Sequence, residues 1–169
     1  MLDILLAAVR NNAKWCDSVT PGIFTESTWY SPRRTPDYYP DAITLRPTAI
    51  PDDFLPHIDA SPGCSVKDSF AALDLTWYGF VELFRAQWIH RPAGSPGPIE
   101  VDADLTHAAG VVGVTNAVGT VWSAVIGSAA ARFPGVPLVG YERGADLTRA
   151  LASGFTTVGP LVVWQRPAN

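Results

Sequence analysis

The stretch that decides the fold is residues 110–164, GVVGVTNAVGTVWSAVIGSAAARFPGVPLVGYERGADLTRALASGFTTVGPLVVW. Three of its segments are apolar and rich in β-branched side chains, a pattern typical of buried strands. These segments are residues 110–116, 136–141 and 158–164. Two helical patterns separate them, and this alternation of strands and helices predicts an α/β (α+β) fold.

The first helix of this stretch is expected over residues 121–133, which are rich in alanine and end at Pro134-Gly135. The second is a short helix that Asp146 caps and that runs to Ser153, with Gly154 as its stop. Together with the strands expected further upstream, the sheet should be mixed, mostly antiparallel, built of about six strands and flanked by helices.

The N-terminal half, residues 1–92, has a different character because it is rich in aromatic side chains. Apolar residues at helical spacing, beginning at Leu2, predict a helix to about Trp15. Residues 23–40 lack a sustained period and predict a long ordered loop. The remaining expected elements are a strand at 42–45, a turn or short helix at 50–57, a strand and bend at 64–75, and a strand at 80–89, where a helix is the alternative.

Composition narrows the class of protein. The chain has 169 residues, which suits one domain spanning residues 1–169, with the Pro/Gly/Ser-rich residues 92–98 as an internal linker. A formal charge of −4 argues against a nucleic-acid partner. No apolar run is long enough for a bilayer and no signal peptide is evident, so we expect a cytoplasmic protein. Neither the two cysteines nor the histidines have metal-ligand spacing, and no metal is expected.

The C-terminal half carries a resemblance to a known superfamily. Its motifs are the run Phe133-Pro134-Gly135-Val136-Pro137-Leu138-Val139-Gly140-Tyr141-Glu142, then Gly154-Phe155, Gly159-Pro160-Leu161 and Trp164. In this order they resemble the closing half of a GNAT acyltransferase domain, in particular that of GNAT-like proteins of high-GC bacteria. The resemblance covers residues 110–166 and implies a GNAT-like sheet and acyl transfer to an amine.

The resemblance also implies a cofactor, acetyl-CoA or another acyl-CoA. GNAT enzymes hold its diphosphate with a Gln/Arg-x-x-Gly-x-Gly/Ala loop and the following helix start. The corresponding residues here are Asn116, Gly119 and Thr120, in a loop that is shorter and keeps a single glycine. Ala150 stands where many GNAT enzymes have a tyrosine acid. These departures predict an altered acyl-CoA site in a trimmed domain.

Candidate catalytic residues lie in the strand expected over residues 64–75. Lys67 and Asp68 could serve as a base, while Ser65 and Ser69 share the strand face of Lys67 and could bind substrate. The alternative is a solvated strand face that pairs with an Asp or Glu side chain next to it and has no chemical role.

Six further residues are candidates for substrate binding. An arginine pair could grip an anion bidentately, and tryptophan can line a cleft as well as a core. The alternatives are a surface arginine pair and tryptophans packed in the core. The six are Asn12, Trp15, Trp29, Arg33, Arg34 and Trp88.

Three functions remain open from the sequence. The first is a GNAT-like enzyme of small-molecule metabolism, which includes specialised metabolism. It would acylate an amine through an atypical acyl-CoA site. The second is a repurposed scaffold that binds or converts a metabolite without coenzyme A. The third is a non-catalytic subunit, since the exposed edge of a trimmed sheet suits a homodimer or a partner protein.

Overall fold

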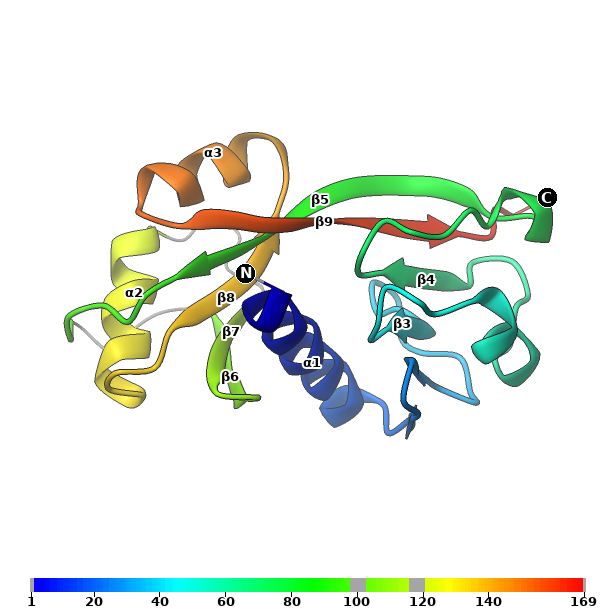
Figure 1. Cartoon of the computed structure of the whole chain (residues 1–169), viewed down its shortest axis with the longest axis horizontal. Coiled ribbons are helices and arrows are strands. Elements are labelled where there is room, and N and C mark those ends of the chain that lie inside the picture. Colours follow the sequence, from blue (N-terminus) through cyan, green and yellow to red (C-terminus); the bar gives the residue numbers. More distant parts are fainter. Residues whose placement is uncertain (1, 98–102, 116–120, 169) are drawn as a thin grey trace. The chain divides into compact units, whose positions relative to one another are not determined.

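The computed structural model (Figure 1) describes residues 2–97, 103–115 and 121–168. Within these ranges the chain forms α-helices, short 3-10 helices and β-strands, so the predicted mixed α/β class is confirmed. The helices are α1 (Leu2–Val19), α2 (Trp122–Arg132) and α3 (Gly144–Ala152), with 3-10 turns η1 (Pro51–Asp53), η2 (Leu55–His57) and η3 (Thr76–Tyr78).

Nine strands in the described ranges form one sheet: β1 (Ile23–Phe24), β2 (Thr28–Tyr30), β3 (Ala42–Thr44), β4 (Ser65–Asp68), β5 (Val81–Arg91), β6 (Asp104–Ala108), β7 (Val111–Thr115), β8 (Leu138–Glu142) and β9 (Thr156–Gln165). Their order is β1-β2-β3-β4-β9-β5-β8-β7-β6. Most described pairs are antiparallel, whereas β3–β4 and β7–β8 are parallel.

The expectation of about six strands is therefore wrong. The three missed strands are β1, β2 and β6, which are two, three and five residues long. Two of them lie in residues 23–40, so the prediction of one long loop there is also wrong. Such short segments show no period of their own and become strands because a neighbouring strand pairs with them.

The chain divides into two compact units, and β5 and β9 contribute residues to both. Unit 1 consists of Met1–Asn12 and Gln87–Gly159, and unit 2 of Ala13–Ala86 and Pro160–Asn169. The described part of the expected linker, residues 92–97, lies in unit 1 and has no regular secondary structure. The interpretation of the whole chain as one domain stays a prediction.

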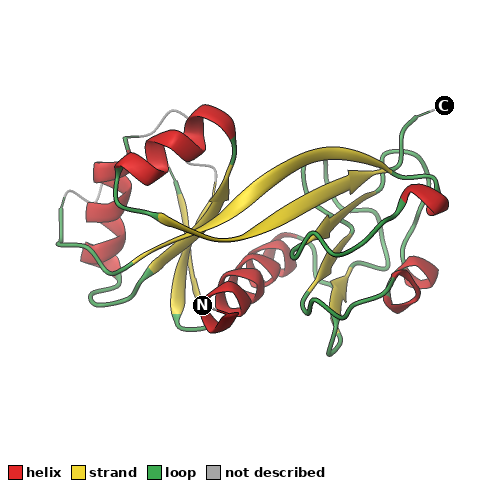
Figure 2. Ribbon diagram, turned by 45° about the horizontal axis from the view of Figure 1, so that its top comes forward, coloured by secondary structure: helices red, strands yellow, loops and turns green. Residues whose placement is uncertain are grey.

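Unit 1 is organised by the segment β7–α2–β8, in which a helix joins two parallel strands (Figures 1 and 2). The strands and the helix expected from the quoted stretch are confirmed to within about two residues, the usual uncertainty of element ends. Each fully buried aliphatic side chain contributes about 1.5–3 kcal/mol. The buried cluster that holds α2 against the strands includes Ile89, Val112, Val125, Leu138, Ala129 and Phe155.

The start of α3 differs from the expectation. Asp146 is not the cap, because the helix is preceded by Arg143 and shows no side-chain cap. Asp146 lies in the first turn, where a carboxylate also interacts favourably with the helix dipole, and it pairs with Arg149. Gly154 does end this helix with a φ of 87°, as predicted.

Asn11 of α1 connects that helix to the hairpin of β6 and β7 within unit 1. Its Nδ2 group donates to the carbonyls of Thr106 at 2.7 Å, Ala108 at 3.1 Å and Val111 at 3.1 Å. The side chain is buried and lies against Gly113, where an added Cβ would stand 1.9 Å from Asn11 Oδ1. The amide therefore requires a glycine at position 113.

We expect Asn11→Ala and Gly113→Ala each to lower the free energy of unfolding by about 2–3 kcal/mol, because the first leaves buried carbonyls without donors and the second forces the amide out. The double variant should cost less than the sum, since alanine at position 11 makes room for the new methyl group. Urea unfolding measures all three, with the exposed Arg10→Ala as control. Strictly additive costs would contradict this packing.

In unit 2 the sheet has two different faces. α1 lies on one face, where Trp29 Nε1 donates to Asp17 Oδ1 of that helix at 3.0 Å. The row of side chains on this face is Trp29, Ile43, Lys67 and Val163. The opposite row is Tyr30, Ala42, Val66 and Trp164, which joins a second buried cluster with Phe54, Leu75 and Phe80.

Candidate active site

The two parallel strands of unit 1, β7 and β8, run toward the same edge of the sheet. Their register, with Gly113 beside Val139, brings the ends of the strands, Thr115 and Glu142, to that edge. Ligands of open α/β sheets bind outside the carboxyl ends of the strands. Groups with unusual protonation behaviour at this edge are therefore candidates for chemistry.

Glu142 is such a group. Burial raises the pKa of its carboxyl from the ordinary value of 4.5 to about 7, and repulsion from Asp146 adds to the rise while Arg149 opposes it. The side chain is half-buried, and its residue pairs with Gln87 of β5. A carboxyl group that titrates near neutral pH can both take up and release a proton under physiological conditions.

Sequence reasoning did not select Glu142, although a signal was present. The residue directly follows the apolar strand expected over residues 136–141, and a single acid at the end of a buried strand is worth notice. What raises its pKa is the shielding from water that the folded unit provides, and this shielding cannot be read from the strand alone.

Next to this edge, the start of α2 is the part of the expected acyl-CoA site that the structure describes. The helix begins after Val121, which has an extended backbone and no side-chain cap. The first amides of a helix lack partners inside the helix and attract anions. The predicted cofactor residues Asn116, Gly119 and Thr120 lie outside the described residues. A diphosphate site at the start of α2 therefore stays a prediction.

The raised pKa of Glu142 predicts a pH-dependent stability. The folded state holds this proton more tightly than the unfolded chain, so the stabilising contribution is fully present below pH 4.5 and is lost as pH rises through about 7. Glu142→Gln keeps the shape without the charge, so its melting temperature relative to wild type should rise between these pH values. Glu26→Gln, whose side chain is 82% exposed, is the matched control. A difference that stays constant with pH would show that Glu142 has an ordinary pKa.

The residues predicted as catalytic lie on β4 in unit 2. Lys67 is 3% exposed and faces α1, so the alternative of a solvated strand face is wrong. Asp68 accepts hydrogen bonds from the amides of Phe70 at 3.2 Å and Leu73 at 2.8 Å and from Thr44 Oγ1 at 3.4 Å. Its carboxylate thus fixes the turn after β4, which favours a structural role.

Ser69 and Ser65 flank this pair and are held in different ways. Ser69 is fully buried, and its amide donates to Thr44 Oγ1 at 2.8 Å. The Ser65 amide donates to Asp41 Oδ2 at 3.0 Å, and its hydroxyl donates to the carbonyl of Tyr39 at 3.4 Å. Both serines take part in the hydrogen bonding that connects β4 to its neighbours.

The predicted arginine pair separates in the structure. The Arg34 guanidinium donates to the carbonyls of Asp59 at 2.8 Å, Ser61 at 3.3 Å and Pro62 at 2.7 Å, and its Nε lies 3.9 Å from Asp41 Oδ2. Arg34 therefore orders the loop before β4. Arg33 is exposed, and its backbone amide donates to Ser31 Oγ. The two side chains do not form one anion clamp.

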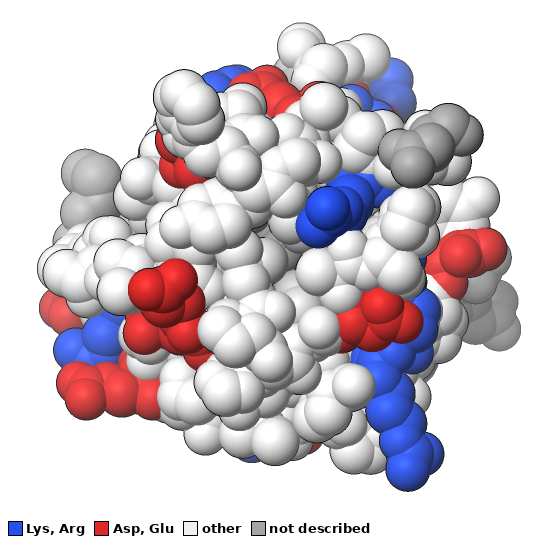
Figure 3. Space-filling view, turned by 90° about the vertical axis from the view of Figure 1, so that its right-hand side faces the viewer, with Lys and Arg blue, Asp and Glu red and all other residues white. Residues whose placement is uncertain are grey.

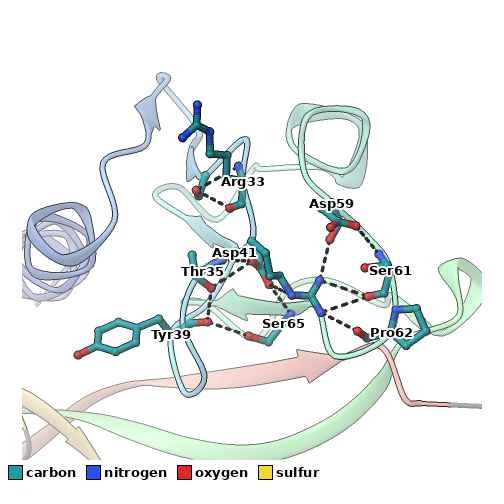
Figure 4. Close-up of polar contacts among 10 residues, drawn as sticks. Arg33, Thr35, Tyr39, Asp41, Asp59, Ser61, Pro62 and Ser65 are labelled. Atoms are coloured by element: carbon teal, nitrogen blue, oxygen red, sulfur yellow. Dashed lines mark hydrogen bonds and ion pairs between the residues drawn. The ribbon is translucent and has the colours of Figure 1, made fainter.

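Asp41 is a buried polar residue that the sequence did not single out. The residue is 2% exposed, and its carboxylate accepts hydrogen bonds from the Thr35 amide at 2.9 Å, the Thr35 hydroxyl at 3.0 Å and the Ser65 amide at 3.0 Å (Figure 4). Burial, followed by the charge of Asp41, raises the pKa of the Cys64 thiol to about 12. The carboxylate connects two loops to the first residue of β4.

Asp41→Asn should lower the free energy of unfolding by about 2–4 kcal/mol. The asparagine NH2 group would face N–H and O–H groups that also donate, and the substitution would remove the negative charge opposite Arg34. Urea unfolding measures the loss. Asp37→Asn, in the same segment but exposed, should change stability by less than about 0.5 kcal/mol. Equal losses of stability in the two variants would contradict the structural role of Asp41.

The predicted aromatic residues are mostly interior. Trp29 and Trp88 are 0% and 1% exposed, and Trp88 packs edge-on against Tyr141 with ring centroids 5.4 Å apart. In this structure neither tryptophan presents a surface to a ligand. Asn12 is also buried, whereas Trp15 is half-buried with its ring 5.0 Å from that of Tyr39. Asn12 and Trp88 belong to unit 1, and the other predicted binding residues belong to unit 2.

Comparison with known proteins found no matching family model, no matching curated protein and no matching solved structure. Within the described ranges no helix is long and apolar enough to cross a membrane. The same residues contain no group of three or more His, Cys, Asp or Glu side chains placed to hold a metal ion. A proposal for function therefore rests on the side chains of this chain.

Proposed function

We propose that the chain is a GNAT-like enzyme that transfers an acyl group from an acyl-CoA to the amine of a small molecule. The observation that carries the proposal is Glu142, a half-buried carboxyl with a pKa of about 7 at the carboxyl ends of β7 and β8. The resemblance of residues 110–166 to the closing half of GNAT domains supports the reaction class. Because acyl-CoA is an intracellular metabolite, the proposed compartment is the cytoplasm.

Glu142 acts as the general base in this proposal. A primary amine is an ammonium ion at neutral pH and attacks a carbonyl only after it loses a proton. The carboxylate form of Glu142 accepts that proton, and its raised pKa makes the transfer more favourable than to an ordinary glutamate. The neutral amine would then attack the thioester carbonyl, so that the C–N bond forms, the C–S bond breaks and coenzyme A leaves as a thiolate. The thiolate would take up the second proton lost by the nitrogen, and Glu142 would release the first proton to water.

The acyl donor would be held by the residues between β7 and β8. Bound acyl-CoA supplies the acyl group as a reactive thioester. Asn116, Gly119 and Thr120 would hold its diphosphate together with the uncapped start of α2. The single glycine in this loop predicts weaker donor binding than in an ordinary GNAT enzyme.

Two measurements test the proposal. Acetyl-CoA should raise the melting temperature of wild type, because a ligand that binds only the native state stabilises it. At a hundredfold excess over Kd, the free energy of unfolding should increase by about 2.7 kcal/mol. With a panel of small primary amines, the release of coenzyme A thiol should increase with pH through about 7 in wild type. Glu142→Gln should keep the thermal shift and lose activity by about a hundredfold or more.

The exposed Glu26→Gln should behave as wild type in both measurements. Absence of a thermal shift at millimolar acetyl-CoA would reject the acyl-CoA donor. A shift with unchanged activity in Glu142→Gln would reject Glu142 as the base while keeping the reaction class.

A second candidate is the binding or conversion of a metabolite without coenzyme A. The observation in its favour is Lys67, which is 3% exposed and lies on the sheet face that α1 covers. Lysine is almost never fully buried unless it is paired, so its environment here is a specific one. Lys67 would then carry the chemistry, with Asp68 holding the turn beside it. A missing response to acetyl-CoA, together with an unaffected Glu142→Gln variant, is the outcome that would favour this candidate.

A further inference from the structure

One buried hydrogen-bond donor of unit 2 has no acceptor. Trp164 of β9 is 6% exposed, and its Nε1 has no hydrogen-bond partner among the residues that the structure describes. A buried indole N–H usually finds an acceptor, because an unpaired donor in the interior is unfavourable. This donor therefore points to an acceptor that the described part of the chain does not itself supply.

A second donor, Arg166, lies two residues further along the chain. Its amide donates to the carbonyl of Cys64 at 2.8 Å, and its carbonyl accepts from the Gly63 amide at 2.7 Å. The pairing of β9 thus continues through this residue into the segment before β4. Residues two apart in an extended strand point to the same face, so the side chains of Trp164 and Arg166 leave the same face of the sheet.

The guanidinium of Arg166 lies at the margin of the apolar cluster of unit 2. Its Cζ atom is 6.0 Å from the centroid of the Phe80 ring, and the residue is half-buried. In the described ranges this guanidinium takes part in no ion pair and no side-chain hydrogen bond. An arginine in this situation keeps its positive charge and its N–H donors for a ligand.

The surroundings of the two donors are apolar. Trp164 belongs to the buried cluster that also contains Tyr30, Phe54, Leu75 and Phe80. Partly buried apolar side chains pack along its margin, namely Leu55, Ile58, Ala71 and Leu73. The face shown in Figure 3 carries acidic and basic side chains in small groups with uncharged surface between them, so no broad charged field covers that face.

We propose that Trp164 and Arg166 form a binding site for a small apolar molecule that carries one carboxylate group. A carboxylate only accepts hydrogen bonds, which matches two side chains that only donate. Its oxygens would accept from Trp164 Nε1 and from the Arg166 guanidinium, a preferred partner of carboxylates. One positive charge balances one negative charge, whereas a phosphate dianion would leave charge unbalanced beside an apolar cluster. The apolar part of the ligand would pack against the margin of the cluster.

This site is separate from the proposed acyl transfer. Trp164 and Arg166 belong to unit 2, whereas Glu142 belongs to unit 1. Loss of the carboxylate site would therefore leave the response to acetyl-CoA unchanged, and the two proposals fail independently.

Nuclear magnetic resonance of the tryptophan indole N–H groups tests the contact with Trp164 in the isotope-labelled full chain. The signal of Trp164 is the one that Trp164→Phe lacks. It should move to lower field when phenylacetate or hexanoate is added, because the N–H then donates to a carboxylate. The matched amides, phenylacetamide and hexanamide, should leave it in place. No movement with either carboxylate at millimolar concentration, or equal movement with the amides, would overturn the proposal.

A charge-matched pair of variants tests the role of Arg166. Arg166→Gln should raise the Kd for phenylacetate, measured by isothermal titration, by about tenfold or more, because hydrogen bonds between charged groups are the strong ones. Arg46→Gln makes the same change in net charge at a side chain that is 47% exposed and should leave Kd unchanged. Circular dichroism and the melting temperature confirm that each variant is folded.

This comparison does not depend on Trp164→Phe folding, since it needs only wild type and the two arginine variants. Equal Kd values in Arg166→Gln and Arg46→Gln would exclude Arg166 from the site. Absence of any heat of binding to wild type, for phenylacetate and hexanoate alike, would reject the site itself.

Discussion

The hydrogen bonds of Asn11 are the constraint on which the candidate site depends. Its amide joins α1 to the hairpin of β6 and β7, and β7 in turn sets the parallel register of β8. β8 ends at Glu142, so the position of the proposed base follows from this succession of contacts. A glycine at position 113 is what allows the amide to reach the hairpin. Packing far from the reacting group thus determines where that group stands.

The carboxylates of this protein differ in what surrounds them. Asp41 and Asp68 each accept three hydrogen bonds, which connect them to neighbouring loop and strand segments. Glu142 is half-buried near a second acid, and the loss of water raises its pKa to about 7. The first two carboxylates are therefore suited to hold loops, whereas Glu142 is suited to move a proton. The contrast distinguishes structural acids from a candidate catalytic one without reference to any relative.

Particular residues show how far sequence reasoning reaches. The strands and helices of residues 110–164 could be predicted because long apolar segments must be buried and have a clear period. The strand at 80–89 was also predicted correctly. Short strands such as β2 could not be predicted, since three residues carry no period and depend on pairing with β3. Lys67 was noticed as a polar residue in a strand, but its burial and the hydrogen bonds of Asp68 follow from contacts between distant segments.

The sequence by itself determined the α/β class and the order of the main elements. These properties follow from hydrophobic period and turn residues, which are local along the chain. Tertiary structure alone decided that Glu142 is shielded, that Arg34 is engaged by the loop before β4, and that Trp164 Nε1 is buried without an acceptor among the described residues. Solvent exclusion and strand register arise between residues far apart in sequence, and no local pattern records them.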